Sequence, residues 1–456
     1  MIRFLLSFAL AAVAFTGGAQ TLNVNIGQVT YAYPADRTGD MTVSDAGVGI
    51  GGTTFPISKI TNITVGNNAV ADNTVDVSYN GTTAKVVISG DIAGLVTAKV
   101  NGAHVTLLQS ADTSNEITYT LSGTTTDGSL YMDGSLKATF VLNGVSINNP
   151  DSAAINIQDG KRVAIILPEG KENTLSDGIK GANDGTDAHN ACFYVDGHTE
   201  FDGAGTLTIK GNVKHAFTSD EYCLFKRKAG TVIVASAIGD GFHIGQYYRQ
   251  KGGTVKINAQ GDGVDVGAKK DTTKDKNGQL LIEGGMITVS STGAKSDAMK
   301  CDSLFAMSGG TVDLLATGAG GRVINCNANV EISGGELRGA SCGKVSDPGL
   351  ETERKSHGIK SDGSITISGG TVLIAASADK GKSFKADYTL AFNGGTIMGI
   401  GGKSVTASTV STQGSKQYVS VPVTAASTVS FDGVSFAVPM QYVNPSAYVI
   451  VSKQGM

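Results

Sequence analysis

Apolar and polar residues alternate along short stretches of the chain, and these stretches recur. Ile365, Ile367, Val372 and Ile374 alternate with polar residues on either side of a Gly-Gly pair. This alternation predicts two short strands with one buried face, joined by a tight corner at the glycines. This Gly-Gly motif, or an Ala-Gly variant of it, recurs along the chain. Its second residue is Gly205, Gly230, Gly253, Gly285, Gly310, Gly335, Gly370 and Gly395.

The successive steps between these glycine positions are 25, 23, 32, 25, 25, 35 and 25. The two longest steps contain polar insertions near 268–279 and 346–356, which leaves a period near 25. A fixed period of this size is typical of solenoids and propellers, but a propeller blade needs four strands and about 40 residues. Each repeat here holds three short strand candidates. The pattern therefore predicts an all-β fold, a right-handed parallel β-helix with about 25 residues per coil.

The period also divides the chain. Residues 1–19 carry one arginine, an apolar run and then small residues, which predicts a signal peptide. We assign 20–82 to an N-terminal β segment, 83–415 to the β-helix and 416–456 to a C-terminal β cap, because stacked strands need a cover at each end. No cysteine follows the apolar run, and no other stretch is long and apolar enough to span a bilayer. We expect an exported monomer, either secreted or held in the periplasm or at the cell surface.

Composition excludes several partners. The net charge is −4, so no basic excess points to nucleic acid. Gly381-Lys382-Ser383 resembles the end of a phosphate-binding loop, but Ala376 stands where that motif needs its first glycine. The six histidines show no local spacing of zinc ligands. Neither nucleotide nor zinc binding is therefore indicated.

Residues that lie at the same number of positions before the Gly-Gly corner are predicted to stack on one another in successive repeats. One outward column contains Asn190, His215, Asp240, Asp262, Asp297, Arg322, His357 and Lys382. A second contains Phe193, Thr218, His243, Asp265, Lys300, Asn325, Lys360 and Lys385. The inward residues beside it are Cys192, Phe217, Phe242, Val264, Met299, Ile324, Ile359 and Phe384. Two polar columns are therefore expected along one outer sheet.

Carboxylates in adjacent coils are candidate ligands for calcium, which takes several oxygen ligands in irregular geometry. The predicted metal ligands are Asp240, Asp262, Asp265 and Asp297. The alternative is that these aspartates are solvent-exposed turn residues, because Asp-Gly is a common sequence in turns. Lysine neutralises uronate carboxylates as a point charge. The predicted lysine contacts to an acidic sugar chain are Lys300, Lys360 and Lys385.

Two repeats depart from the apolar pattern before the corner, at 222–230 and 244–253. Aromatic rings stack on sugars and arginine pairs with carboxylates. The residues predicted to bind carbohydrate there are Tyr247, Tyr248, Arg227 and Arg249, with Lys226 and Lys228 beside them. The alternative is a locally different strand register with a solvated basic edge.

Five cysteines are an odd number for an exported chain. Cys301 and Cys326 are one repeat apart and share one predicted column, so their Cα atoms should lie within disulfide range. Small inward residues, Ser361 and Ala386, share that column. The pair therefore fits either a disulfide or a row of small buried side chains.

The chain also resembles a known family over roughly 130–415. The words that carry the resemblance are HGIKSDGSITISGGT, GDGVDV and DAMKCD, with GAGTLTIKGN and NTLSDG upstream. It resembles secreted bacterial carbohydrate-binding proteins that are right-handed parallel β-helices, similar in fold to pectate lyases. This resemblance implies binding of Ca²⁺ and acidic plant polysaccharide. Asp240-Gly241-Phe242-His243 and Arg322-Val323-Ile324-Asn325 depart from the recurring G-D-G-I-K motif, which weakens the carry-over of ligand and metal contacts in those coils.

Three functions remain open from the sequence. The first is a non-catalytic protein that binds a polysaccharide. The second is a calcium-dependent lyase acting on uronates, which needs a base, and Lys300 beside Asp297 and Asp265 is the best local candidate. The third is a structural or adhesive surface solenoid. The fold alone does not distinguish these three functions.

Overall fold

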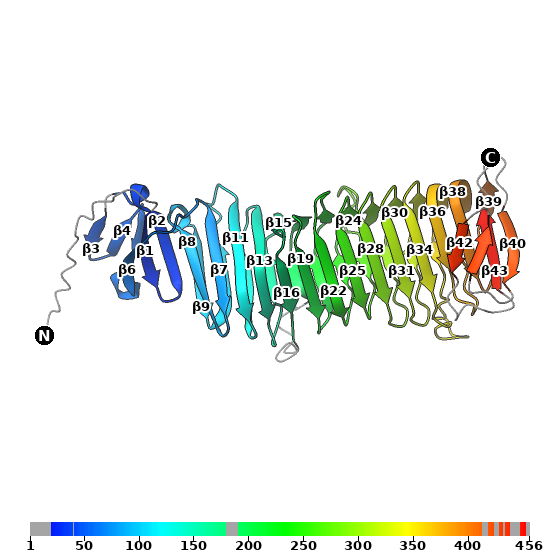
Figure 1. Ribbon diagram of the computed structural model, residues 1–456, viewed down its shortest axis with the longest axis horizontal. Helices are drawn as coiled ribbons and strands as arrows, with labels where there is room; N and C mark the ends of the chain where they lie inside the picture. The colour runs from blue at the N-terminus through cyan, green and yellow to red at the C-terminus, as the bar shows by residue number, and fades with distance from the viewer. Residues whose placement is uncertain are drawn as a thin grey trace.

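A computed structural model describes residues 20–39, 41–178 and 190–412, and the backbone of four strands within 418–452. The predicted signal peptide lies outside the described residues. Within them the protein is all-β, as predicted, and its helical elements are the short 3-10 turns η1 (Ala35–Arg37), η2 (Ile57–Lys59) and η3 (Gly90–Ile92). None of these is long and apolar enough to cross a membrane. The strands lie side by side along an elongated rod (Figure 1).

One row of strands forms a 12-stranded sheet. From β10 onward its neighbours run parallel, and β9 pairs with β10 in the antiparallel sense. Its strands are β9 (Val96–Asn101), β10 (Ala103–Gln109), β12 (Gly128–Asp133), β14 (Ile155–Gln158), β17 (Ala191–Val195), β20 (His215–Ser219), β23 (Phe242–Ile244), β26 (Val264–Val266), β29 (Met299–Cys301), β32 (Ile324–Cys326), β35 (Ile359–Ser361) and β37 (Phe384–Ala386).

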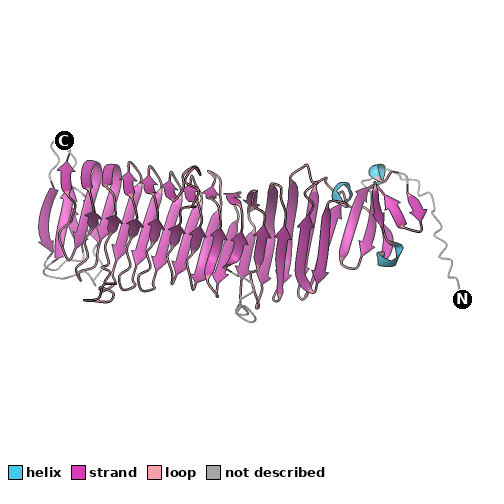
Figure 2. Cartoon of the chain, turned by 180° about the vertical axis from the view of Figure 1, so that it is seen from behind, coloured by secondary structure: helices cyan, strands magenta, loops and turns pink. Residues whose placement is uncertain are grey.

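Two further rows belong to a 26-stranded sheet, and strands β11, β13, β36 and β38 each run through both rows. The second row is β11 (Ile117–Thr125), β13 (Ala138–Asn148), β15 (Arg162–Ile166), β18 (His198–Asp202), β21 (Cys223–Phe225), β24 (Tyr247–Gln250), β27 (Gln279–Ile282), β30 (Leu304–Met307), β33 (Asn329–Ile332), β36 (Ile365–Ala375), β38 (Thr389–Gly401) and β39 (Thr409–Thr412). The third row is β16 (Glu172–Ser176), β19 (Thr206–Gly211), β22 (Thr231–Ala237), β25 (Thr254–Ala259), β28 (Met286–Ser291), β31 (Thr311–Ala316) and β34 (Glu336–Ser341). One strand from each row makes up what we call a layer, and Figure 2 shows the layers from the opposite side.

The two ends of the rod pair differently. The N-terminal strands are β1 (Thr21–Ile26), β2 (Val29–Pro34), β3 (Thr42–Ser44), β4 (Gly47–Ile50), β5 (Thr53–Phe55), β6 (Asn62–Gly66), β7 (Thr74–Asn80) and β8 (Thr83–Ser89), and several of them pair antiparallel. The C-terminal strands are β40 (Tyr418–Val423), β41 (Thr428–Phe431), β42 (Val434–Ala437) and β43 (Ala447–Ser452). Strand β43 pairs antiparallel with β38 and so occupies an edge that would otherwise be unpaired.

Glycine makes the corner between the second and third rows, as the sequence predicts. In the repeats from Gly253 to Gly395, the second glycine of the motif has φ between 76° and 83°. A Cβ on Gly395 would lie 2.5 Å from the carbonyl oxygen of Gly370, and one on Gly370 would lie 2.6 Å from that of Gly335. Only glycine therefore allows both the positive φ and the close stacking of one corner on the next.

Inward side chains fill the space between the rows. Phe193, Phe217 and Phe242 lie in successive layers of the 12-stranded sheet, with ring centroids 5.3 Å apart at each step. Phe225 packs against Phe242 from the second row. All four are fully buried, and each such side chain contributes on the order of 2 kcal/mol through burial. This core holds the outward residues of the 12-stranded sheet in register.

Candidate functional site

The outer face of the 12-stranded sheet carries one column of residues that point away from the core, and three of its members, Thr218, Asn325 and Lys360, are buried. Strand pairing places one residue of the column in each layer, so its members are neighbours across the sheet. The column contains Tyr131, Asn156, Tyr194, Thr218, His243, Asp265, Lys300, Asn325, Lys360 and Lys385.

The predicted second column agrees with this register from Thr218 onward, but its first member is wrong. Tyr194 pairs with Thr218, whereas Phe193 pairs with Phe217 and points inward. The prediction that Cys192 stacks on Phe217 fails with it. The irregular corner after this strand displaces the expected register by one position, and such a shift exchanges the two faces of a strand.

A hollow of about 390 Å³ lies at the N-terminal end of the column. Tyr131, Asn156 and Tyr194 line it, together with Gln158 and Asn149. Tyr194 Oη donates a hydrogen bond of 2.7 Å to Asp220, which fixes the ring in place. Phenol and amide groups around a hollow can hydrogen-bond hydroxyl groups and offer a ring for stacking. The sequence analysis missed these residues, because the repeat is blurred in this part of the chain.

The predicted acidic column has a structural role. Asp240, Asp262 and Asp297 each accept a hydrogen bond from a backbone N–H one layer later, at a corner where the sheet leaves that N–H unpaired. Oδ1 of Asp240 accepts from Asp262 at 2.8 Å, and Oδ1 of Asp262 accepts from Asp297 at 2.6 Å. His357 Nδ1 accepts from Lys382 at 3.1 Å in the same way. Aspartate and histidine suit these positions because buried N–H groups need an acceptor.

Lys300 neutralises part of the charge in the middle of the column. Its Nζ lies 3.1 Å from Oδ1 of Asp265 and 3.4 Å from Oδ2 of Asp262. Burial lowers the pKa of Lys300, but the charges of Asp265 and Asp262 outweigh burial and raise its pKa above the usual value. Burial and the charge of Asp297 raise the pKa of Asp262 to about 7 despite Lys300. Lys300 is therefore held as a cation, which is the opposite of what a general base requires.

The insertion before Ser356 brings in an unpredicted arginine. Arg354 Nη2 lies 2.5 Å from Oδ2 of Asp297, whose side chain is fully buried. Burial raises the pKa of Asp297, and Arg354 opposes that effect. A buried carboxylate needs such a partner. The four carboxylates predicted to bind calcium are thus already hydrogen-bonded or ion-paired, and calcium binding stays a prediction of the sequence.

A basic cluster occupies the C-terminal end of the same face. We define it as Arg322, Lys355, Lys360, Lys382 and Lys385. Its partner carboxylates are Glu353, Asp362 and Asp387, which leaves a surplus of two positive charges.

The electrostatic effect of the cluster appears at His357. Burial, followed by the charges of Arg322 and Lys385, lowers the pKa of His357 to about 3. Tyr388 follows β37 at the corner and is 65% exposed, so its ring is available for contact. This end of the face therefore suits an anionic ligand.

The aromatic patch predicted from Tyr247 and Tyr248 does not form a sugar platform. Tyr248 is fully buried, and its Oη donates a hydrogen bond of 2.6 Å to Gln250. Tyr247 is half-buried: Tyr222 of the preceding layer stacks on it at 4.8 Å, and Lys276 lies 5.8 Å from its ring centroid. The prediction for Tyr248 is wrong, and Tyr247 has its ring covered by these two neighbours. Strand β24 follows the ordinary inward–outward alternation, so adjacent tyrosines point to opposite faces.

The cations of that patch are mostly paired. Arg249 lies 2.6 Å from Glu283, and Lys226 lies 2.9 Å from Glu200. Arg227 and Lys228 are exposed at the corner after β21. This arrangement supports the alternative of a solvated basic edge for this region. Cys301 and Cys326 pair in register as predicted, and both are free thiols.

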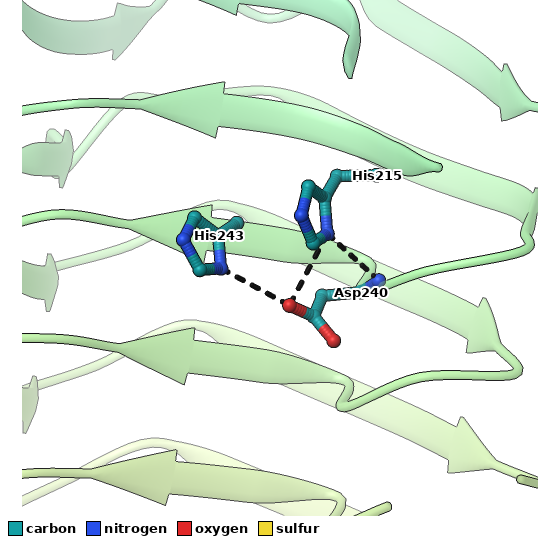
Figure 3. A group of neighbouring side chains, drawn as sticks. All are labelled: His215, Asp240 and His243. Atoms are coloured by element: carbon teal, nitrogen blue, oxygen red, sulfur yellow. Dashed lines mark hydrogen bonds and ion pairs between the residues drawn. The ribbon is translucent and has the colours of Figure 1, made fainter. Parts of the chain in front are cut away.

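Two histidines and one aspartate also come together on this face (Figure 3). His215 Nδ1 lies 3.2 Å from Oδ2 of Asp240, and His243 Nδ1 lies 3.1 Å from the same oxygen. Hydrogen bonds to Asp240 and Asp265, followed by the charges of these carboxylates, raise the pKa of His243 to about 9. The two histidines are more than one repeat apart along the chain, and this separation conceals their contact in the sequence.

Comparison with known proteins assigns the family. Residues 101–405 match the family model described as "Carbohydrate-binding domain-containing protein". This is more than half of the chain, so the protein belongs to that family of carbohydrate-binding domain proteins.

Two relatives are more limited in extent. A carbohydrate-binding domain-containing protein of Acetivibrio thermocellus is 34% identical over 144 residues, which are 30% of this chain and 48% of the relative. The chain thus spans about half the length of that curated relative. A solved structure described as a polysaccharide lyase-like protein from C. thermocellum, in a gadolinium derivative, is 25% identical with a TM-score of 0.47. That match covers 58% of this chain and 99% of the other.

Proposed function

We propose that this protein is a right-handed parallel β-helix that binds a polysaccharide along the outer face of its 12-stranded sheet without cleaving it. The observation that carries the proposal is the in-register column from Tyr131 to Lys385, whose members are half-buried at the surface except for the buried Thr218, Asn325 and Lys360. With one member per layer, the column is about 43 Å long at the usual strand spacing. A linear chain of sugar rings can follow such a row, with one step of the column beside each ring.

The two ends of the column offer different contacts. The hollow around Tyr131 and Tyr194 provides phenol and amide groups for sugar hydroxyls. The basic cluster provides positive charge for carboxylates. Lys360 and Lys385 of the column are paired with Asp362 and Asp387, and the surplus charges are those of Arg322 and Lys382 beside them. An acidic polysaccharide, such as a polyuronate, fits both ends. Tyr388 adds an exposed ring beside the charges.

A lyase is the weaker alternative. β-Elimination needs a base that is unprotonated at working pH, and Lys300 is the candidate that the sequence offers. Asp265 and Asp262 stabilise the charged form of that lysine. Arg354 is likewise occupied by Asp297. A purely adhesive solenoid would leave the column without a glycan ligand. Export to the periplasm, cell surface or medium, expected from 1–19, would place the protein where polysaccharides occur.

A binding panel tests the function. The purified protein is titrated calorimetrically with polygalacturonate and with an uncharged β-glucan, each with calcium and with chelator. We expect binding of polygalacturonate that weakens as salt rises, because exposed charges are screened. The same samples are assayed by ultraviolet absorbance for unsaturated product, and none is expected. Product formation would favour the lyase, and lack of binding to every polysaccharide would favour the adhesive solenoid.

A further inference from the structure

His215, Asp240 and His243 form a compact donor set on two adjacent layers. Among the described residues, they are the one group of three or more His, Cys, Asp or Glu side chains whose donor atoms all lie within 4.8 Å of each other. The imidazole rings stack at 4.5 Å with planes 17° apart, and both direct Nδ1 at Oδ2 of Asp240 (Figure 3).

The hydrogen bonds around His215 leave a conflict. Its Nδ1 accepts a hydrogen bond from the backbone N–H of Asp240 at 3.0 Å, which requires that nitrogen to be unprotonated. The same nitrogen lies 3.2 Å from the carboxylate oxygen of Asp240. The two contacts exclude each other, because Nδ1 has one lone pair: it either accepts from the N–H or, when protonated or metal-bound, faces the carboxylate.

The charge balance points in the same direction. Asp240, Asp262 and Asp265 are three neighbouring carboxylates, linked through His243 and Lys300. Lys300 is the one lysine that contacts them among the described ion pairs, and it reaches Asp262 and Asp265. Asp240 has no lysine or arginine partner among the described ion pairs, so its charge is balanced by the neighbouring histidines. A divalent cation at Asp240 would supply that charge in place of a protonated histidine.

We propose that His215, Asp240 and His243 bind a divalent transition metal of the zinc class. Two imidazole nitrogens and one carboxylate oxygen are a ligand set typical of zinc, whereas calcium requires six or more oxygens. Metal–ligand bonds of about 2.0–2.2 Å place neighbouring ligand atoms slightly more than 3 Å apart, which matches the observed separations. The side chain of His243 is 41% exposed, so a fourth coordination position opens to solvent.

This site is separate from the calcium prediction and does not require a bound glycan. Sequence spacing conceals it, because His215 belongs to the first column and His243 to the second column of the next layer. The metal would lie beside the step of the column that His243 occupies, between Thr218 and Asp265. The proposal can therefore fail while carbohydrate binding stands, and the reverse also holds.

Zinc titration of the protein without a histidine tag tests the proposal. We expect about one equivalent of zinc to bind, and His243→Gln or Asp240→Asn to weaken it at least about tenfold. Asp240→Asn keeps an oxygen that can accept from the N–H of Asp262, so the fold is preserved. His104→Gln is the matched control, because His104 lies elsewhere on the sheet beside Asp127. Circular dichroism confirms that each variant is folded.

Cobalt(II) supplies a second readout. Cobalt bound by two imidazoles and a carboxylate in a tetrahedral site gives visible d–d bands, which should appear in wild type and in His104→Gln. They should be lost in His243→Gln. Absence of zinc binding to wild type, or equal affinity in wild type and His243→Gln, would overturn the proposal.

Discussion

The backbone N–H of Asp297 donates a hydrogen bond of 2.6 Å to Oδ1 of Asp262, one layer earlier in the stack. A side chain that the sequence presents as a metal ligand thus completes the backbone hydrogen bonding of the next corner. The acceptor matters to this role and the negative charge does not, so the two contributions can be separated by substitution.

Asp262→Asn should leave the stability nearly unchanged, because the amide oxygen still accepts the hydrogen bond and the charge repulsion with Asp297 is removed. Asp262→Ala should lower the free energy of unfolding by about 1–3 kcal/mol, since it leaves a buried N–H unpaired. Chemical denaturation of both variants measures the difference. Equal destabilisation by the two substitutions would contradict the backbone role.

His357 should make the protein less stable in mild acid. Its folded pKa of about 3 lies below the usual 6.5, so the unfolded chain alone takes up a proton between these values. Stability should fall as pH drops below 6.5, by about 2 kcal/mol at pH 5 from this group. His357→Asn keeps an acceptor for the N–H of Lys382 and removes the titration. Its denaturation midpoint should depend less on pH than that of wild type, and parallel pH profiles would refute the assignment.

Tyr194 tests the hollow. Tyr194→Ala should weaken polysaccharide binding by about 1 kcal/mol, roughly fivefold in Kd, through loss of a stacking surface. Tyr194→Phe keeps the ring and loses only the hydrogen bond to Asp220, so it should retain most of the affinity. Calorimetric titration compares the two. If the alanine variant binds like wild type while its melting temperature is unchanged, the hollow takes no part in binding.

Zinc and calcium should affect the melting temperature differently. A ligand that binds the folded state alone raises it, and zinc at equal concentration should raise it more than calcium. The zinc effect should vanish in His243→Gln. A calcium effect that disappears in Asp262→Asn with Asp265→Asn, and persists in His243→Gln, would instead support the calcium site predicted from the sequence. Thermal melts in each metal and in chelator measure both.

Periodicity predicts the main features of the fold because glycine corners and inward apolar residues recur at fixed offsets. The positive φ of Gly253 and Gly395 and the burial of Ile359 follow from this pattern. Periodicity also aligns Asp265 with Lys300 and Lys360 with Lys385. These relationships depend only on counting residues within regular repeats.

The parts of the site that the sequence could not reveal lie where the repeat is irregular, so counting residues does not place them. Arg354 reaches Asp297 from an insertion whose path has no period. An irregular corner displaces Tyr194 from its expected place, and strand alternation turns Tyr248 inward although its repeat departs from the apolar pattern. His215 and His243 belong to different predicted columns in adjacent layers, so neither column predicts their contact.

The most direct test of the account compares polygalacturonate binding by wild type and by the double variant Lys360→Gln with Lys385→Gln. The matched control is Lys59→Gln with Lys85→Gln, which removes two exposed charges from the N-terminal segment. Calorimetry at low salt should show roughly tenfold weaker binding in the first variant, at about 0.7 kcal/mol per lysine, and no change in the control. Equal loss in both variants, or none in either, would contradict binding along the outer face of the 12-stranded sheet.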